Sequence, residues 1–203
     1  MRDAALPDRD ARRTATTVFD RNLVVEAGAG TGKTSLLVER LLVALGAGLA
    51  DASSFAAITF TEKAAAEMRE RLAAGLEELR ALAGGARPDA AKASGRAFAH
   101  LTGERGIAKA DLAPRALSAL VDLDRAKVVT IHGFCSELLR SHPLEAGVVP
   151  GFAVDDGPLY KALLDEAWEE FLRAELGPAA ARGALWRRLL SEADIGAVRK
   201  AAL

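Results

Sequence analysis

Residues 23–34 read Leu-Val-Val-Glu-Ala-Gly-Ala-Gly-Thr-Gly-Lys-Thr, and this stretch decides the fold. Residues 23–27 are apolar enough to predict a short buried strand. The glycines at 28, 30 and 32 predict a turn whose successive backbone N–H groups point to one side. From Lys33 to about Leu45 apolar residues recur at helical spacing. A strand, a glycine-rich turn and a helix in this order predict a loop that binds phosphate oxygens.

The predicted phosphate loop is Ala27-Gly28-Ala29-Gly30-Thr31-Gly32-Lys33-Thr34. Lys33 is expected to reach the β- and γ-phosphates of ATP, and the Thr34 hydroxyl to hold Mg²⁺. Ala27 stands where such a loop usually begins with glycine, and the residues from Gly28 to Gly32 still supply the turn. The alternative is a glycine-rich turn followed by an incidental Lys-Thr pair, which the complete strand–turn–helix context disfavours.

Further strands and helices are predicted on either side of an irregular region. Residues 55–60 predict a second buried strand, followed by an N-cap at Thr61 and a long helix. The apolar stripe of that helix is Met68, Leu72, Leu76 and Leu79. Residues 83–113 predict a loop-rich connection with short helical pieces, and residues 128–131 a third strand with a helix after it. Strands alternating with helices predict an α/β fold with a parallel sheet flanked by helices, and the all-helical end of the chain predicts a separate part.

Composition limits the function classes. The chain has 203 residues, a net charge of −1 and a pI of about 6.3, so any contact with DNA must be local. Cys135 is the only cysteine, which excludes an intramolecular disulfide, and its apolar neighbours predict a packed thiol. No stretch is long and apolar enough to span a bilayer. These features predict a soluble, cytoplasmic protein without a membrane partner.

Two further segments resemble a known family. Residues 57–68 (Ala-Ile-Thr-Phe-Thr-Glu-Lys-Ala-Ala-Ala-Glu-Met) resemble motif Ia of superfamily 1 DNA helicases of the UvrD type. Residues 130–135 (Thr-Ile-His-Gly-Phe-Cys) resemble the next DNA-contacting motif, in the form typical of the RecB and AddA helicase–nuclease subunits. The resemblance covers roughly residues 20–160. It implies a RecA-like P-loop NTPase fold and an ATP-dependent DNA helicase of repair and recombination. It also implies single-stranded or partly duplex DNA, and other subunits of a helicase–nuclease complex, as partners.

Five residues at predicted strand ends are candidates for DNA contact: Thr59, Phe60, Thr61, Thr130 and His132. An exposed Phe60 would stack on an unpaired base, while the hydroxyls and the imidazole would donate to phosphate oxygens. Each residue also has a structural alternative. Phe60 could be a core aromatic, Thr61 a helix cap, Thr130 a strand residue and His132 a structural histidine.

Several parts expected in this family are missing from the sequence. Hydrolysis needs an acidic pair at a strand end, and Asp155-Asp156 is a poor match because it leads into Gly157-Pro158. The resemblance implies an adenine-reading glutamine near Arg12, but the chain has no glutamine, so adenine selectivity stays open. We therefore expect a partial first RecA-like motor domain over residues 1–155, the start of a helical accessory domain over 156–203, and no turnover by this chain alone.

Two other functions remain open on the sequence. One is a non-catalytic nucleotide-binding or single-strand-binding module of a larger complex, which the missing acids favour. The other is a small-molecule kinase with a phosphate loop. It would need an arginine-rich lid, and residues 83–113 carry arginines without a recognisable lid pattern.

Overall fold

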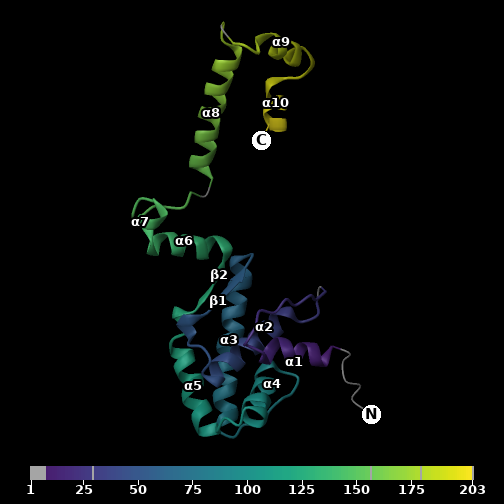
Figure 1. Cartoon of the computed structure of the whole chain (residues 1–203), viewed down its shortest axis with the longest axis vertical. Helices are drawn as coiled ribbons and strands as arrows, with labels where there is room; N and C mark the ends of the chain where they lie inside the picture. The colour runs from purple at the N-terminus through teal and green to yellow at the C-terminus, as the bar shows by residue number, and fades with distance from the viewer. Residues whose placement is uncertain (1–7, 29, 156, 179, 203) are drawn as a thin grey trace. The chain divides into compact units, whose positions relative to one another are not determined.

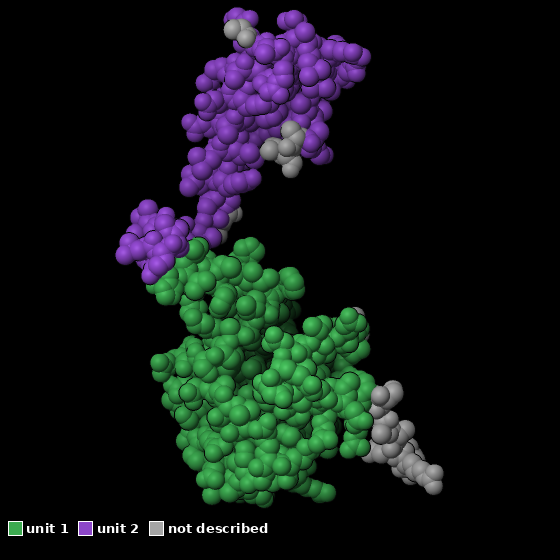
Figure 2. All heavy atoms as spheres, in the orientation of Figure 1, with its two compact units in different colours: residues 1–142 green, residues 143–203 purple. Residues whose placement is uncertain are grey.

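The computed structural model describes residues 8–28, 30–155, 157–178 and 180–202, and the chain divides into two compact units. We call residues 1–142 the N-terminal unit and residues 143–203 the C-terminal unit (Figure 2). The N-terminal unit contains α1 (Arg9–Thr17), α2 (Lys33–Ala47), β1 (Ala56–Thr59), α3 (Glu62–Ala83), α4 (Ala93–Ala99), α5 (Lys109–Val121), β2 (Lys127–Thr130) and α6 (Ile131–Ser141), with short helical turns η1 (Ala52–Ser54), η2 (His100–Glu104) and η3 (Leu123–Arg125). The C-terminal unit contains α7 (Pro143–Ala146), α8 (Pro158–Leu176), α9 (Gly183–Glu192) and α10 (Ile195–Ala202).

The sheet of the described residues has two strands, β1 and β2, which run parallel. Thr59 pairs with Thr130, so both strands end level and both turn away at the same edge of the sheet. Each strand leads into a helix that is capped by a threonine hydroxyl. Thr61 accepts a hydrogen bond from the N–H of Ala64 (3.1 Å), and Thr130 accepts one from the N–H of Gly133 (3.1 Å). The second and third predicted strands and the Thr61 cap are therefore confirmed, with shifts of about one residue at the strand ends.

The strand predicted over residues 23–27 is wrong. No strand is assigned there, and Val24 and Val25 are 92% and 46% exposed. The physical reason is that a strand needs a neighbouring ladder for its N–H and C=O groups, and the β1–β2 ladder does not extend to this segment. An apolar run predicts burial only where a partner exists.

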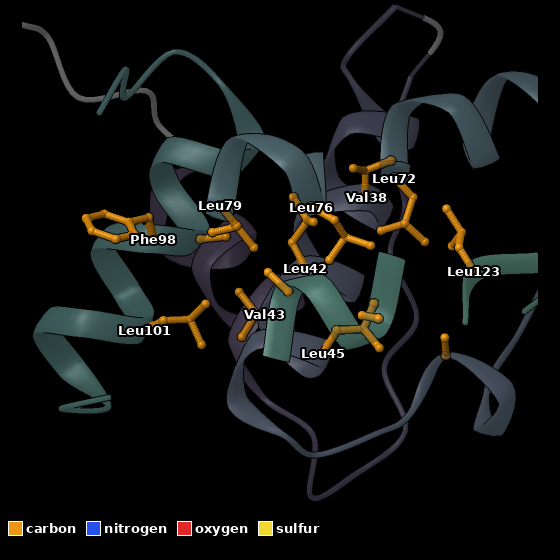
Figure 3. Packing of buried hydrophobic residues seen from close by; sticks show 14 of the residues in the cluster. Val38, Leu42, Val43, Leu45, Leu72, Leu76, Leu79, Phe98, Leu101 and Leu123 are labelled. Carbon is orange, nitrogen blue, oxygen red and sulfur yellow. The ribbon is translucent and has the colours of Figure 1, made fainter. Parts of the chain in front are cut away.

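The core of the N-terminal unit lies where α3 packs against α2, α4, α5 and β2 (Figure 1). The predicted stripe of α3 is confirmed, because Met68, Leu72, Leu76 and Leu79 are all buried. Figure 3 shows Leu42 of α2 beside Leu76 in the middle of the cluster. Helix α2 turns a different face inward from the one predicted, since Leu37 is 45% exposed while Leu36 and Leu45 are buried.

A glycine allows α2 and α3 to approach each other closely. A Cβ on Gly75 of α3 would lie 2.8 Å from Cδ1 of Leu42, and Leu42 has no exposed surface. Larger residues at this position would force the two helices apart. The side chain of Arg69 adds a polar tie between α3 and the sheet by donating to the carbonyl of Val128 (2.8 Å).

The connection predicted over residues 83–113 holds α4, η2 and the first turn of α5, so its short helical pieces are confirmed. Arg96 joins α4 to α2 through Glu39 (2.7 Å). Glu78 of α3 accepts hydrogen bonds from Lys92 and Ser94, which lower the pKa of its carboxyl and hold the preceding loop against α3.

The C-terminal unit is helical, as predicted. Phe171 of α8 packs on Trp168 and meets Trp186 of α9 edge-on, with ring centroids 5.6 and 5.9 Å apart. Glu175 accepts a hydrogen bond from the indole of Trp186 (2.8 Å), which fixes α9 against α8. None of the helices in the described part of the chain is long and apolar enough to cross a membrane.

Candidate functional site

The predicted phosphate loop joins residues 23–27 to the start of α2. Gly30 and Gly32 have φ angles of 75° and 87°, a left-handed conformation that other residues rarely adopt. Gly32 is the residue before α2 and has no side chain to cap it, so the N–H groups of the first turn are left for another acceptor. These groups and the partial positive charge of the helix end favour an anion.

The polar side chains of the loop turn back onto its own backbone. Nζ of Lys33 lies 2.9 Å from the carbonyl oxygen of Ala27 and 2.7 Å from that of Gly28. The hydroxyl of Thr31 donates to the same Gly28 oxygen (2.8 Å), and Thr34 is half-buried in the first turn of α2. The structure thus brings Lys33 and Thr34 together with the glycines of the loop, while Ala29 lies outside the described residues.

A pocket of about 340 Å³ adjoins the loop on the side of α1. Its volume falls within the range of small-molecule sites. Apolar side chains supply much of its wall, and its polar groups come from α1, from the segment before the loop and from the loop itself. The lining residues are Asp8, Ala11, Arg12, Thr14, Ala15, Leu23, Val24, Val25, Glu26, Ala27, Thr31, Lys33 and Leu36.

Arg12 links α1 to the loop. Its Nε donates to Asp8 (2.7 Å) and its Nη2 donates to the carbonyl oxygen of Thr31 (2.9 Å). Helix α1 was not predicted from sequence, because its only apolar residues are Ala11 and Ala15. Their helical spacing was the available signal. The whole α1 wall of the pocket was therefore missed.

Arg40 of α2 holds the other end of α1. Its Nη1 donates to the carbonyl oxygens of Ala15 and Val18 (2.7 Å each), and its guanidinium lies 4.2 Å from the ring centroid of Phe19. Burial lowers the pKa of Arg40 from its usual value. A cation at the carbonyl end of a helix is stabilising, so Arg40 fixes the wall of the pocket.

The candidate DNA contacts gather at the edge where β1 and β2 end. Phe60 is 90% exposed, which excludes a core aromatic, and Thr61 and His132 are exposed as well. His132 lies in the first turn of α6, not at the end of a strand as predicted, because the Thr130 cap starts the helix one residue after the ladder ends. Thr59 is half-buried and donates to the carbonyl of Thr61 (3.0 Å).

Thr130 differs from the other four candidates. It is 7% exposed, and its hydroxyl donates to Oε1 of Glu62 (2.8 Å) while accepting from Gly133. This pairing joins the start of α3 to the start of α6. A phosphate contact by Thr130 would require Glu62 to release the hydroxyl.

Two other candidates from the sequence have structural surroundings of their own. Asp155 accepts backbone hydrogen bonds from Tyr160, Leu159 and Gly157 (2.8–3.0 Å), which lower the pKa of its carboxyl and cap α8. Its partner Asp156 lies outside the described residues. Cys135 is exposed, so the prediction of a packed thiol is wrong: α6 has no buried residues to pack it against.

Comparison with known proteins gives one family. Residues 8–192 match the family described as "UvrD/REP helicase N-terminal domain". The match includes the phosphate loop, the α1 wall of the pocket and the edge with Phe60.

Similar proteins from several bacteria are named as ATP-dependent helicase/nuclease subunits of the AddA type. That of Desulforudis audaxviator (strain MP104C) is 34% identical over 158 residues, which is 77% of this chain and 11% of the relative. That of Geobacillus thermodenitrificans (strain NG80-2) is 33% identical over 172 residues, which is 84% of this chain and 12% of the relative. The chain therefore spans about a tenth of the length of these relatives.

Proposed function

The chain belongs to the UvrD/REP helicase N-terminal domain family, and on that premise we propose that it binds ATP with Mg²⁺ as part of an ATP-dependent DNA helicase. The helicase would be of the UvrD, RecB and AddA type and act in DNA repair and recombination. In this proposal the two parallel strands and the helices around them belong to a RecA-like P-loop NTPase fold.

One observation carries the proposal: a loop with two left-handed glycines and an uncapped helix start adjoins a pocket of about 340 Å³. The loop supplies N–H donors for a triphosphate, and the pocket has room for the rest of a nucleotide. On binding, the Lys33 ammonium exchanges the carbonyl oxygens of Ala27 and Gly28 for phosphate oxygens. These carry a full negative charge and bind it more strongly.

The residues present fit a magnesium ion. The Thr34 hydroxyl lies in the first turn of α2, beside the N–H groups that would hold the phosphates. A hard cation such as Mg²⁺ takes oxygen ligands from one or two protein groups and the phosphates, and it neutralises their charge. Thr34 is the group of this chain that would hold it.

DNA is the proposed partner at the other edge of the sheet. Phe60 presents nearly its whole ring to an unpaired base, and Thr59, Thr61, Thr130 and His132 surround it at the ends of the strands. Such contacts recognise the backbone and the base face without reading sequence. Other subunits of a helicase–nuclease complex are proposed as protein partners, as the names of the relatives suggest.

We further propose that residues 1–155 belong to the first motor domain and residues 156–203 to a helical accessory domain, and that this chain alone turns ATP over negligibly. The support is that Asp155, the best candidate for a catalytic acid, spends its oxygens on three N–H groups of α8 and the residue before it. The same observation favours a second function, a nucleotide- or single-strand-binding module that acts without hydrolysis.

Calorimetric titration with Mg-ATP tests the central proposal. Lys33→Ala removes a charge-assisted contact worth about 1.5–3 kcal/mol, so affinity should fall at least about tenfold. Lys161→Ala, on exposed α8, is the matched control and should leave affinity unchanged. Equal affinities for the wild type and Lys33→Ala would overturn the proposal. Steady DNA-stimulated turnover, lost in Asp155→Asn, would show that the acid had been misjudged.

A further inference from the structure

The guanidinium of Arg12 is held at the boundary between the pocket and the phosphate loop. Nε is bonded to Asp8 and Nη2 to the carbonyl of Thr31, at 2.7 and 2.9 Å. Nη1 lies over the loop, 3.8 Å from where a Cβ on Gly32 would stand. Contacts on both sides fix the plane of the group, so its remaining N–H donors are presented to a fixed place in the pocket.

The chemistry of these donors matches one purine edge better than the other. A guanidinium has five N–H donors and no acceptor, and two of them serve Asp8 and Thr31. Guanine offers two neighbouring acceptors, O6 and N7, and arginine pairs with both at once. Adenine offers N7 beside an amino group that itself donates, and the side chains that pair with this edge are the amides of asparagine and glutamine.

The pocket has no such amide. The chain contains no glutamine, and its single asparagine, Asn22, is not among the residues that line the pocket. The acceptors near Arg12 are the carboxylates of Asp8 and Glu26. They can accept from the amino group of either purine, or from N1–H of guanine, so they do not restore a preference for adenine.

We propose that Arg12 is a specificity-determining residue of this pocket and that the chain binds GTP at least as well as ATP. The inference rests on the proposed function, because it assumes that the pocket beside the loop holds the base of a nucleoside triphosphate. A second role for the same charge would be to contact phosphates. That contact would strengthen all triphosphates equally and leave the ratio of GTP to ATP affinity to the rest of the pocket.

The test is calorimetric titration of the wild type, Arg12→Gln and Arg13→Gln with Mg-ATP and with Mg-GTP. The wild type should bind GTP with an affinity equal to or above that for ATP. Arg12→Gln should shift the ratio of affinities toward ATP by about tenfold, since the amide pairs with adenine and the guanidinium no longer pairs with guanine. Arg13→Gln removes the same charge from the next residue of α1, which pairs with Glu104, and should leave the ratio unchanged.

Each other outcome has one meaning. A wild type that prefers ATP by about tenfold or more, with binding still dependent on Lys33, overturns the inference and leaves the proposed function standing. Equal losses for both nucleotides in Arg12→Gln, with an unchanged melting temperature, assign Arg12 to the phosphates and also overturn it. Binding of neither nucleotide by the folded wild type removes the proposed function, and the inference falls with it.

Discussion

Replacing Phe60 by alanine separates a DNA-contacting ring from a packing ring. The side chain is 90% exposed, so folding buries only about a tenth of it. Full burial of a phenylalanine contributes about 1.5–3 kcal/mol, and a tenth of that is about 0.2–0.3 kcal/mol. For a chain of this size such a loss lowers the melting temperature by about 1 °C.

The same substitution should weaken DNA binding much more. Stacking of one base on an aromatic ring is worth about 1–3 kcal/mol by alanine substitution, which is about a 5- to 150-fold loss of affinity. Fluorescence anisotropy with a short single-stranded oligonucleotide at low salt measures it. The affinity should be the same for different base sequences and fall steeply with salt, because phosphate contacts supply most of it.

Phe98→Ala is the matched control. That ring is 7% exposed in the core, so its loss should lower the free energy of unfolding by about 3–5 kcal/mol. Two results for Phe60→Ala would refute the reasoning. One is unchanged DNA affinity, and the other is a fall in melting temperature comparable to that of Phe98→Ala.

Three further substitutions test the fold that positions the site. Arg40→Ala removes two hydrogen bonds from the end of α1; the free energy of unfolding in urea should fall by about 1–3 kcal/mol, and Mg-ATP affinity should fall as the pocket wall loosens. Gly75→Ala places a Cβ 2.8 Å from Leu42 and should cost about 1–3 kcal/mol, whereas Gly103→Ala meets nothing within 4 Å and should not destabilise; the same urea measurement compares them. The pKa of Asp155 is lowered below its ordinary 3.8, so the carboxylate stabilises α8 above that pH and loses its effect as pH falls through the lowered pKa. Hydrogen exchange at the start of α8 should therefore accelerate on acidification, and in Asp155→Asn already at neutral pH.

The helices that the sequence predicted well are those whose apolar stripe and cap agree. In α3 the Thr61 cap and the buried residues Met68, Leu72 and Leu76 point to the same element, and both are found. Local patterns were enough because the partner of each helical hydrogen bond lies four residues away in the same segment.

The elements that depend on distant partners were predicted poorly. Residues 23–27 have the apolar run of a strand, yet a strand exists only beside another strand, and the sequence of the run alone does not say whether one is there. Helix α1 failed for the opposite reason. Its alanines give little apolar pattern, and it is held by Arg40, which is far along the chain.

The candidate site divides in the same way. The phosphate loop follows from glycines and a lysine at fixed spacing, because the turn is a local structure. The pocket beside it, with Asp8 and Glu26, is assembled from segments that no spacing connects. At the DNA edge, only the structure distinguishes exposed Phe60 from buried Thr130.

The most direct test of the central claim is an amide NMR titration of the ¹⁵N-labelled chain with Mg-ATP and, separately, with AMP. If the loop holds the triphosphate, the largest chemical-shift changes with Mg-ATP should fall on Gly30, Gly32, Lys33 and Thr34. These changes should be small with AMP, which lacks the β- and γ-phosphates. Equal changes with both ligands, or changes concentrated away from the loop, would contradict a triphosphate site at the start of α2.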